Sequence, residues 1–194
     1  FVSFAIGQLL IGKHDSLDGP LGQMFLQSIR DRWEHLEEAT PEDISVFMNE
    51  AYTHDQIPGV INVIKGKFFE NLVEVHENAD GDEWTALLHE DESYPGSDMI
   101  MTNADTGETM ELSLKATQSA NYIESSLLKY PEIPILVSSE VSEQFKDLDM
   151  VIASDFRNSD IQEITESNFE ELVNNLTPFS KIEGISSTTY GVAM

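Results

Sequence analysis

Residues 95–117, PGSDMIMTNADTGETMELSLKAT, contain the pattern that decides the fold. Two runs in this stretch predict strands, residues 99–102 and residues 110–117, and in the second run apolar and polar residues alternate. The NADTG sequence between the runs is typical of a turn, so the strands are predicted to pair as an antiparallel hairpin. Such a hairpin brings Asp98, at the start of the first strand, close to Lys115, near the end of the second.

The elements on either side of the hairpin are predicted from their periodicity. Residues 61–77 (INVIKGKFFENLVEVHE) place apolar side chains at helical spacing, and residues 84–88 (WTALL) follow as a short strand. After the hairpin, residues 119–130 predict an amphipathic helix and residues 133–140 (IPILVSSE) a buried strand. The predicted order is therefore helix, three strands, helix and strand.

This order, with an acid at the start of the hairpin and a lysine at its end, resembles the PD-(D/E)xK superfamily of restriction-endonuclease-like nucleases. The resemblance implies an α/β fold with an αβββαβ core. Matched residue by residue, it puts Glu70 at the acid of the first core helix, Asp98 at the acid that opens the hairpin and Lys115 at the lysine that closes the motif. Ser113 stands where the family has Glu, Asp or sometimes Gln, and Glu111, two residues earlier on the same strand face, is the residue that could compensate.

The resemblance also implies a reaction, the metal-dependent hydrolysis of phosphodiester bonds in DNA. Glu70 and Asp98 are then expected to hold Mg²⁺ or Mn²⁺, which polarises the phosphate and lowers the pKa of a bound water. Lys115 is expected to orient that water or to neutralise charge that develops on the phosphate. Each residue also has an ordinary structural interpretation, because an Asp after Gly-Ser commonly accepts backbone hydrogen bonds and a strand lysine is commonly solvated.

The composition favours a second interpretation. The 194 residues include 10 Lys and Arg against 36 Asp and Glu, which gives a formal net charge of -26. Such a surface repels nucleic acid, whereas nuclease domains usually carry a basic footprint. The nuclease hypothesis therefore predicts the effector or toxin part of a larger protein, whose remainder supplies basic contacts. The alternative is a non-catalytic acidic interaction module on the same scaffold, which binds a cationic protein partner.

The segments outside this core suggest how the chain is divided. Residues 1–57 are predicted to be a helical appendage packed on an α/β core of residues 58–194. Within the appendage, residues 21–39 and 41–54 predict two helices that form a hairpin, the second opened by an N-cap threonine and a proline. The core is expected to close with a strand at 150–153, a helix at 169–176 that starts at a Ser-Asn-Phe-Glu capping box, and an edge strand or loose tail at 181–194.

Several other classes of protein lack support in the sequence. Charged residues interrupt every hydrophobic run, and the most apolar segment, residues 1–11, lacks a basic flank and a small-residue cleavage site. These features predict a soluble protein without a membrane span, either cytoplasmic or delivered as part of a larger one. The chain has no cysteine, its five histidines show no zinc-binding spacing, and no GxSxG motif indicates a serine hydrolase.

Overall fold

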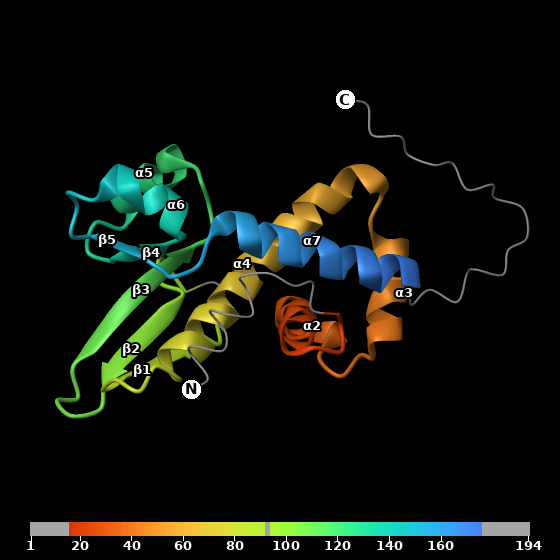
Figure 1. Ribbon diagram of the computed structural model, residues 1–194, viewed down its shortest axis with the longest axis horizontal. Helices are drawn as coiled ribbons and strands as arrows, with labels where there is room; N and C mark the ends of the chain where they lie inside the picture. Colours follow the sequence, from red (N-terminus) through yellow and green to blue (C-terminus); the bar gives the residue numbers. More distant parts are fainter. Residues whose placement is uncertain (1–15, 92–93, 176–194) are drawn as a thin grey trace, which may run out of the picture.

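The computed structural model describes residues 16–91 and 94–175, and in this part of the chain it shows a mixed α/β fold with six α-helices and a five-stranded sheet (Figure 1). The expected α/β class is confirmed. The helices are α2 (Pro20–Arg32), α3 (Pro41–Ala51), α4 (Ile57–Glu77), α5 (Ala120–Lys129), α6 (Ser139–Ser142) and α7 (Asn158–Asn175). The strands are β1 (Trp84–Leu88), β2 (Met99–Asn103), β3 (Thr109–Lys115), β4 (Ile135–Val137) and β5 (Val151–Ala153).

The sheet combines an antiparallel meander with two parallel strands. Its strand order is β1-β2-β3-β4-β5; β1, β2 and β3 pair antiparallel, and β4 and β5 run parallel to β3. The predicted hairpin is confirmed, with Met99 opposite Leu112 in its register. Its turn forms because the Asn103 side chain accepts hydrogen bonds from the next backbone N–H groups and Gly107 adopts a positive φ of 71°.

Helices cover both faces of the sheet. Along β4 the side chains alternate between two hydrophobic clusters: Leu136 belongs to the main core beneath α4, whereas Ile135 and Val137 pack with Ile123 of α5. The C-terminal part of α4 is fixed to β1, because the backbone N–H of Leu88 donates to the carboxylate of Glu74 at 2.9 Å. Figure 1 shows α5 and α6 grouped around β4 and β5, while α4 runs diagonally past β1 to β3.

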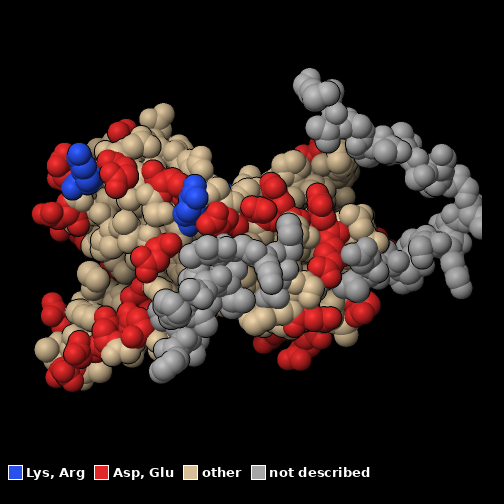
Figure 2. All heavy atoms as spheres, in the orientation of Figure 1, with Lys and Arg blue, Asp and Glu red and all other residues tan. Residues whose placement is uncertain are grey.

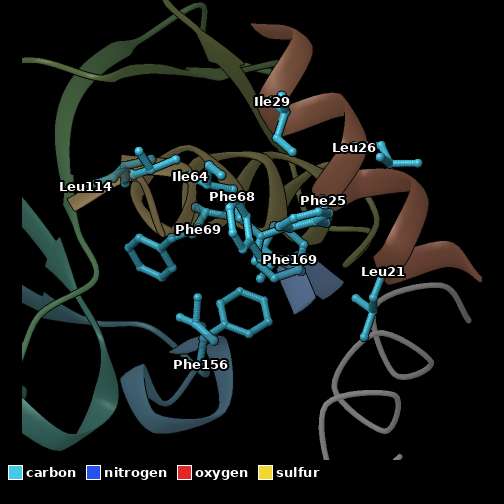
Figure 3. Packing of buried hydrophobic residues seen from close by; sticks show 14 of the residues in the cluster. Leu21, Phe25, Leu26, Ile29, Ile64, Phe68, Phe69, Leu114, Phe156 and Phe169 are labelled. Atoms are coloured by element: carbon cyan, nitrogen blue, oxygen red, sulfur yellow. The ribbon is translucent and has the colours of Figure 1, made fainter. Parts of the chain in front are cut away.

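The main core is built on aromatic residues of α4. Phe68 and Phe69 are fully buried there, and Phe69 meets Phe156 edge to face with ring centroids 6.4 Å apart. Phe25 of α2 and Phe169 of α7 close the cluster from the other side (Figure 3). The core is therefore continuous from the N-terminal helices into the α/β region, across the predicted boundary between residues 57 and 58, which falls in the first turn of α4.

The elements predicted at 21–39 and 133–140 exceed the observed ones by the largest margins. The helix predicted at 21–39 ends at Arg32, because Trp33 turns to extended backbone and its indole N–H donates to the Tyr52 hydroxyl at 3.0 Å. The strand predicted at 133–140 is confined to β4, because the Ser138 hydroxyl donates to the carbonyl of Thr117 at 2.8 Å and the chain turns into α6.

The predicted start of the last helix is wrong. The capping box at Ser167 lies inside α7, which begins nine residues earlier at Asn158. The N-terminal end of α7 is satisfied from another element, since the Glu140 carboxylate accepts hydrogen bonds from the backbone N–H groups of Asn158 and Ser159. The predictions for residues 1–11 and 181–194 lie outside the described residues. Within the described part, no helix combines the length and apolar character needed to cross a membrane.

Candidate functional site

The candidate site lies where β2 and β3 diverge. β3 continues past Leu112, its last partner for β2, so the backbone N–H of Leu114 points toward the space where Asp98 precedes β2. That N–H donates to Asp98 Oδ2 at 2.6 Å, and the same oxygen accepts from Ser113 Oγ at 3.1 Å and from Lys115 Nζ at 2.9 Å. The hairpin therefore places Asp98, Ser113 and Lys115 in direct contact.

Both charged groups of this cluster are largely covered. The side chain of Lys115 is 19% exposed and that of Asp98 is 28% exposed, while Ser113 is buried. Lys115 is therefore not the solvated strand lysine of the ordinary interpretation. Asp98 does accept a backbone hydrogen bond, as the ordinary interpretation expects. Its carboxylate also forms an ion pair with Lys115, which a residue with only a turn-forming role would not need.

Gly96 explains how the chain enters this cluster. Its φ is +82°, and a Cβ at this position would lie 2.5 Å from the Tyr130 ring. Only glycine combines this conformation with the close approach of the ring. Tyr130, just after α5, thereby closes one side of the Asp98 cluster.

Glu70 reaches the same region from α4. It lines a hollow of about 310 Å³ together with Asp98, and its carboxylate pairs with Lys67 at 3.1 Å. Burial raises the pKa of Glu70; Lys67 and Lys115 oppose this shift, while the charge of Asp98 adds to it. Glu70 is thus within electrostatic reach of both Asp98 and Lys115, in a setting where an additional positive charge would stabilise its ionised form.

Glu111 does not join the cluster. Its carboxylate accepts a hydrogen bond from the hydroxyl of Tyr94 at 3.0 Å, an interaction that raises the pKa of Tyr94. Glu111 also pairs with Ile100 in the sheet and lines neither of the hollows beside Asp98. Four of the five expected site residues, Glu70, Asp98, Ser113 and Lys115, are therefore close together. Glu111 is turned toward Tyr94 and does not compensate for Ser113.

Basic residues gather around Asp98 in a way that the sequence did not indicate. A second hollow, of about 300 Å³, lies on the α5 side of Asp98 and is lined by Lys115 and Lys129, whereas Arg32 and Lys67 line the first. The described part contains eight Lys and Arg residues, at positions 30, 32, 65, 67, 115, 129, 146 and 157, and these four are half of them. Half of the Lys and Arg residues that the structure describes therefore line the two hollows beside Asp98, together with the carboxylates of Glu70, Asp91 and Asp98.

His89 is a further residue that sequence reasoning missed. Its Nε2 lies 2.9 Å from the hydroxyl of Ser97, its ring stacks on Tyr94 at 4.1 Å, and it lines the first hollow with Glu70 and Asp98. The spacing of the five histidines along the chain, which shows no zinc-binding pattern, does not indicate this contact. The contact between His89 and Ser97 depends instead on the pairing of β1 with β2.

The donor set is compatible with a magnesium ion. Mg²⁺ binds proteins through one or two carboxylates and keeps several waters, and Glu70 and Asp98 offer two carboxylates on one hollow. Among the described residues, no group of three or more His, Cys, Asp or Glu side chains has the arrangement of a metal site. No protein-family model, no curated protein and no solved structure matches this chain.

Proposed function

We propose that this chain is a metal-dependent nuclease with a restriction-endonuclease-like core, acting on the phosphodiester bonds of DNA. The observation that carries the proposal is the 2.9 Å contact between Lys115 Nζ and Asp98 Oδ2 at the divergence of β2 and β3, beside the partly buried carboxylate of Glu70. The element order α4-β1-β2-β3-α5-β4 supports it, since these are the positions at which the resemblance expects the three residues.

In this proposal the two carboxylates hold the metal. Glu70 and Asp98 would bind Mg²⁺ or Mn²⁺, which when bound neutralises phosphate charge and lowers the pKa of a coordinated water. Lys115 would donate to a phosphate oxygen or hold the attacking water, because its ammonium lies next to the carboxylate that would face the ion. Ser113, which is neutral and donates to Asp98, fixes the orientation of that carboxylate.

The charge distribution determines how DNA could approach. Figure 2 shows groups of acidic side chains scattered across the visible face among uncharged residues, with few basic ones. Arg32 and Lys67 on one side of Asp98, and Lys129 on the other, would give a phosphate backbone its attractive contacts. Further basic contacts would come from the remainder of a larger protein, of which this chain is the proposed effector or toxin part.

The test is the cleavage of supercoiled plasmid by the purified chain at low salt, with Mg²⁺ or Mn²⁺, compared with EDTA. We expect cleavage that Lys115→Ala abolishes and that Lys146→Ala leaves unchanged. Lys146 is the matched control, because it also removes one positive charge but lies in an exposed position after α6. Cleavage that persists in Lys115→Ala, or no cleavage by the parent chain with either metal, would refute the proposal.

A further inference from the structure

A third hollow, of about 270 Å³, opens on the α4 face of the sheet, away from Asp98. Its floor is apolar: Met101 comes from β2, Met110 and Leu112 from β3, and Ile152 from β5, while Trp84 of β1 forms part of the wall. Met101 and Leu112 are buried members of the main core, whereas Trp84, Met110 and Ile152 pack against that core and are only partly buried. No residue lines both this hollow and either of those beside Asp98.

The rim of this third hollow is acidic. Glu77, Asp82 and Asp155 line it, and His76 contacts Asp155 at 3.2 Å. Burial raises the pKa of Glu77, and although His76 opposes the shift, Asp80, Asp82 and Asp155 each raise it further. No Lys or Arg of the described part lines the hollow, so the acidic groups repel one another across an apolar floor.

We propose that this hollow is a docking site for a basic segment of another protein, which inserts an apolar side chain and places Lys or Arg against Glu77, Asp82 and Asp155. The volume of the hollow suits an inserted side chain better than a whole small molecule, because pockets for drug-sized ligands measure roughly 300–1,000 Å³ and this hollow is smaller. The charge fits it as well, since a basic side chain relieves the repulsion at the rim while an apolar one covers the partly exposed side chains of Trp84, Met110 and Ile152.

Other occupants are disfavoured by charge. A second copy of the chain carries the same formal net charge of -26, so two copies repel each other at long range. Anionic lipid headgroups and phosphate backbones meet the same repulsion at the acidic rim. The docking site is separate from the proposed nuclease site, and it stands whether or not the chain cleaves DNA.

The experiment uses Trp84 as a reporter inside the hollow. The chain contains two tryptophans, and Trp33 lies at the end of α2, so the Trp33→Phe variant leaves Trp84 as the fluorophore. The probe is a capped peptide of alternating Lys and Leu, titrated at low salt against capped peptides of alternating Lys and Gly and of alternating Glu and Leu. We expect a saturable shift of Trp84 emission with the Lys-Leu peptide, and at least about tenfold weaker binding of the other two.

Two charge-matched variants test the location. The triple variant Glu77→Gln, Asp82→Asn, Asp155→Asn should weaken binding of the Lys-Leu peptide about tenfold, as expected for the loss of three ion pairs at the protein surface. The control removes three exposed acids elsewhere, by replacing Glu37, Glu38 and Glu42 with Gln. An equal loss in the control would mean non-specific attraction to an acidic protein, and a Trp84 shift that follows protein concentration alone would mean self-association. Either result, or no saturable shift with the Lys-Leu peptide, would overturn the proposal.

Discussion

Replacing Asp98 by Asn separates the structural role of this residue from its proposed role in metal binding. The asparagine oxygen can still accept a hydrogen bond from the backbone N–H of Leu114. Lys115, however, loses its counterion while its side chain stays only 19% exposed. Exposed ion pairs contribute about 0.2–1 kcal/mol, and breaking a fully buried pair costs about 3–5 kcal/mol. The pair of Asp98 and Lys115 lies between these limits, so we expect Asp98→Asn to lower the free energy of unfolding by about 1–3 kcal/mol.

The measurement is urea unfolding followed by tryptophan fluorescence, arranged as a double-mutant cycle. Lys115→Met should cost less, about 0.5–1.5 kcal/mol, because Asp98 then keeps two hydrogen-bond donors and partial contact with water. The coupling between the two substitutions should be about 1 kcal/mol. Asp105→Asn, in the exposed hairpin turn, is the control and should stay within about 0.5 kcal/mol of the parent.

Metal binding provides the second readout of the same variant. If Asp98 is a ligand, Mg²⁺ at ten times its Kd should raise the free energy of unfolding of the parent chain by about 1.4 kcal/mol, or roughly 3–6 °C in Tm, and should leave Asp98→Asn unaffected. A destabilised variant that retains the full Mg²⁺ effect would restrict Asp98 to a structural role and remove it from the proposed site. A variant as stable as the parent would show that the ion pair with Lys115 contributes nothing to the fold.

Three further predictions concern the scaffold and the second acid of the site. Hydrogen bonds from the start of α7 outweigh burial and lower the pKa of Glu140, so Glu140→Gln should cost about 1 kcal/mol above pH 4.5. The difference from the parent should vanish as the pH falls through the lowered pKa. The control Glu143→Gln, at an exposed residue, should cost less than about 0.5 kcal/mol at neutral pH. Burial raises the pKa of Glu70, so its ionised form destabilises the fold and Glu70→Gln should have a higher Tm than the parent. This difference in Tm should grow as the pH rises from about 4.5, and a difference that shrinks with rising pH would contradict the reasoning. Phe68→Ala should cost about 3–5 kcal/mol in urea unfolding, whereas Leu128→Ala, at a residue 85% exposed, should cost less than about 0.5 kcal/mol.

The elements that the sequence predicts well are those whose pattern is local. The alternation in residues 110–117 and the turn at residues 103–107 fix the hairpin, because both strands and their connection lie within a few residues of one another. The helical spacing in residues 61–77 predicts most of α4 for the same reason. The start of α7 could not be predicted, because the group that caps it is Glu140, which is distant in sequence from Asn158.

The residues of the candidate site likewise fall into those that the local sequence predicts and those that depend on distant contacts. The proximity of Asp98 to Lys115 follows from the hairpin register, so the sequence alone predicts it. The direction in which the Glu111 carboxylate points could not be predicted from its position on the strand. The Tyr94 hydroxyl that it contacts comes from the loop before β2. The approach of Arg32 and Lys129 to the same region depends on how α2 and α5 pack, which has no local signal.

The formal net charge of -26 weighs against a nuclease only if the charge is spread evenly. Exposed charges separated by more than the Debye length, about 8–10 Å at physiological salt, are largely screened from one another. A phosphate beside Asp98 is therefore influenced mainly by the charges that line its two hollows, which are Arg32, Lys67, Lys115 and Lys129 against Glu70, Asp91 and Asp98. A basic side chain at the opposite end of α4 is influenced by Glu77 and its acidic neighbours. The arrangement of charge along α4 thus allows one chain to act on an anionic substrate at one site and to bind a cationic partner at another, because each ligand responds to the charges nearest to it.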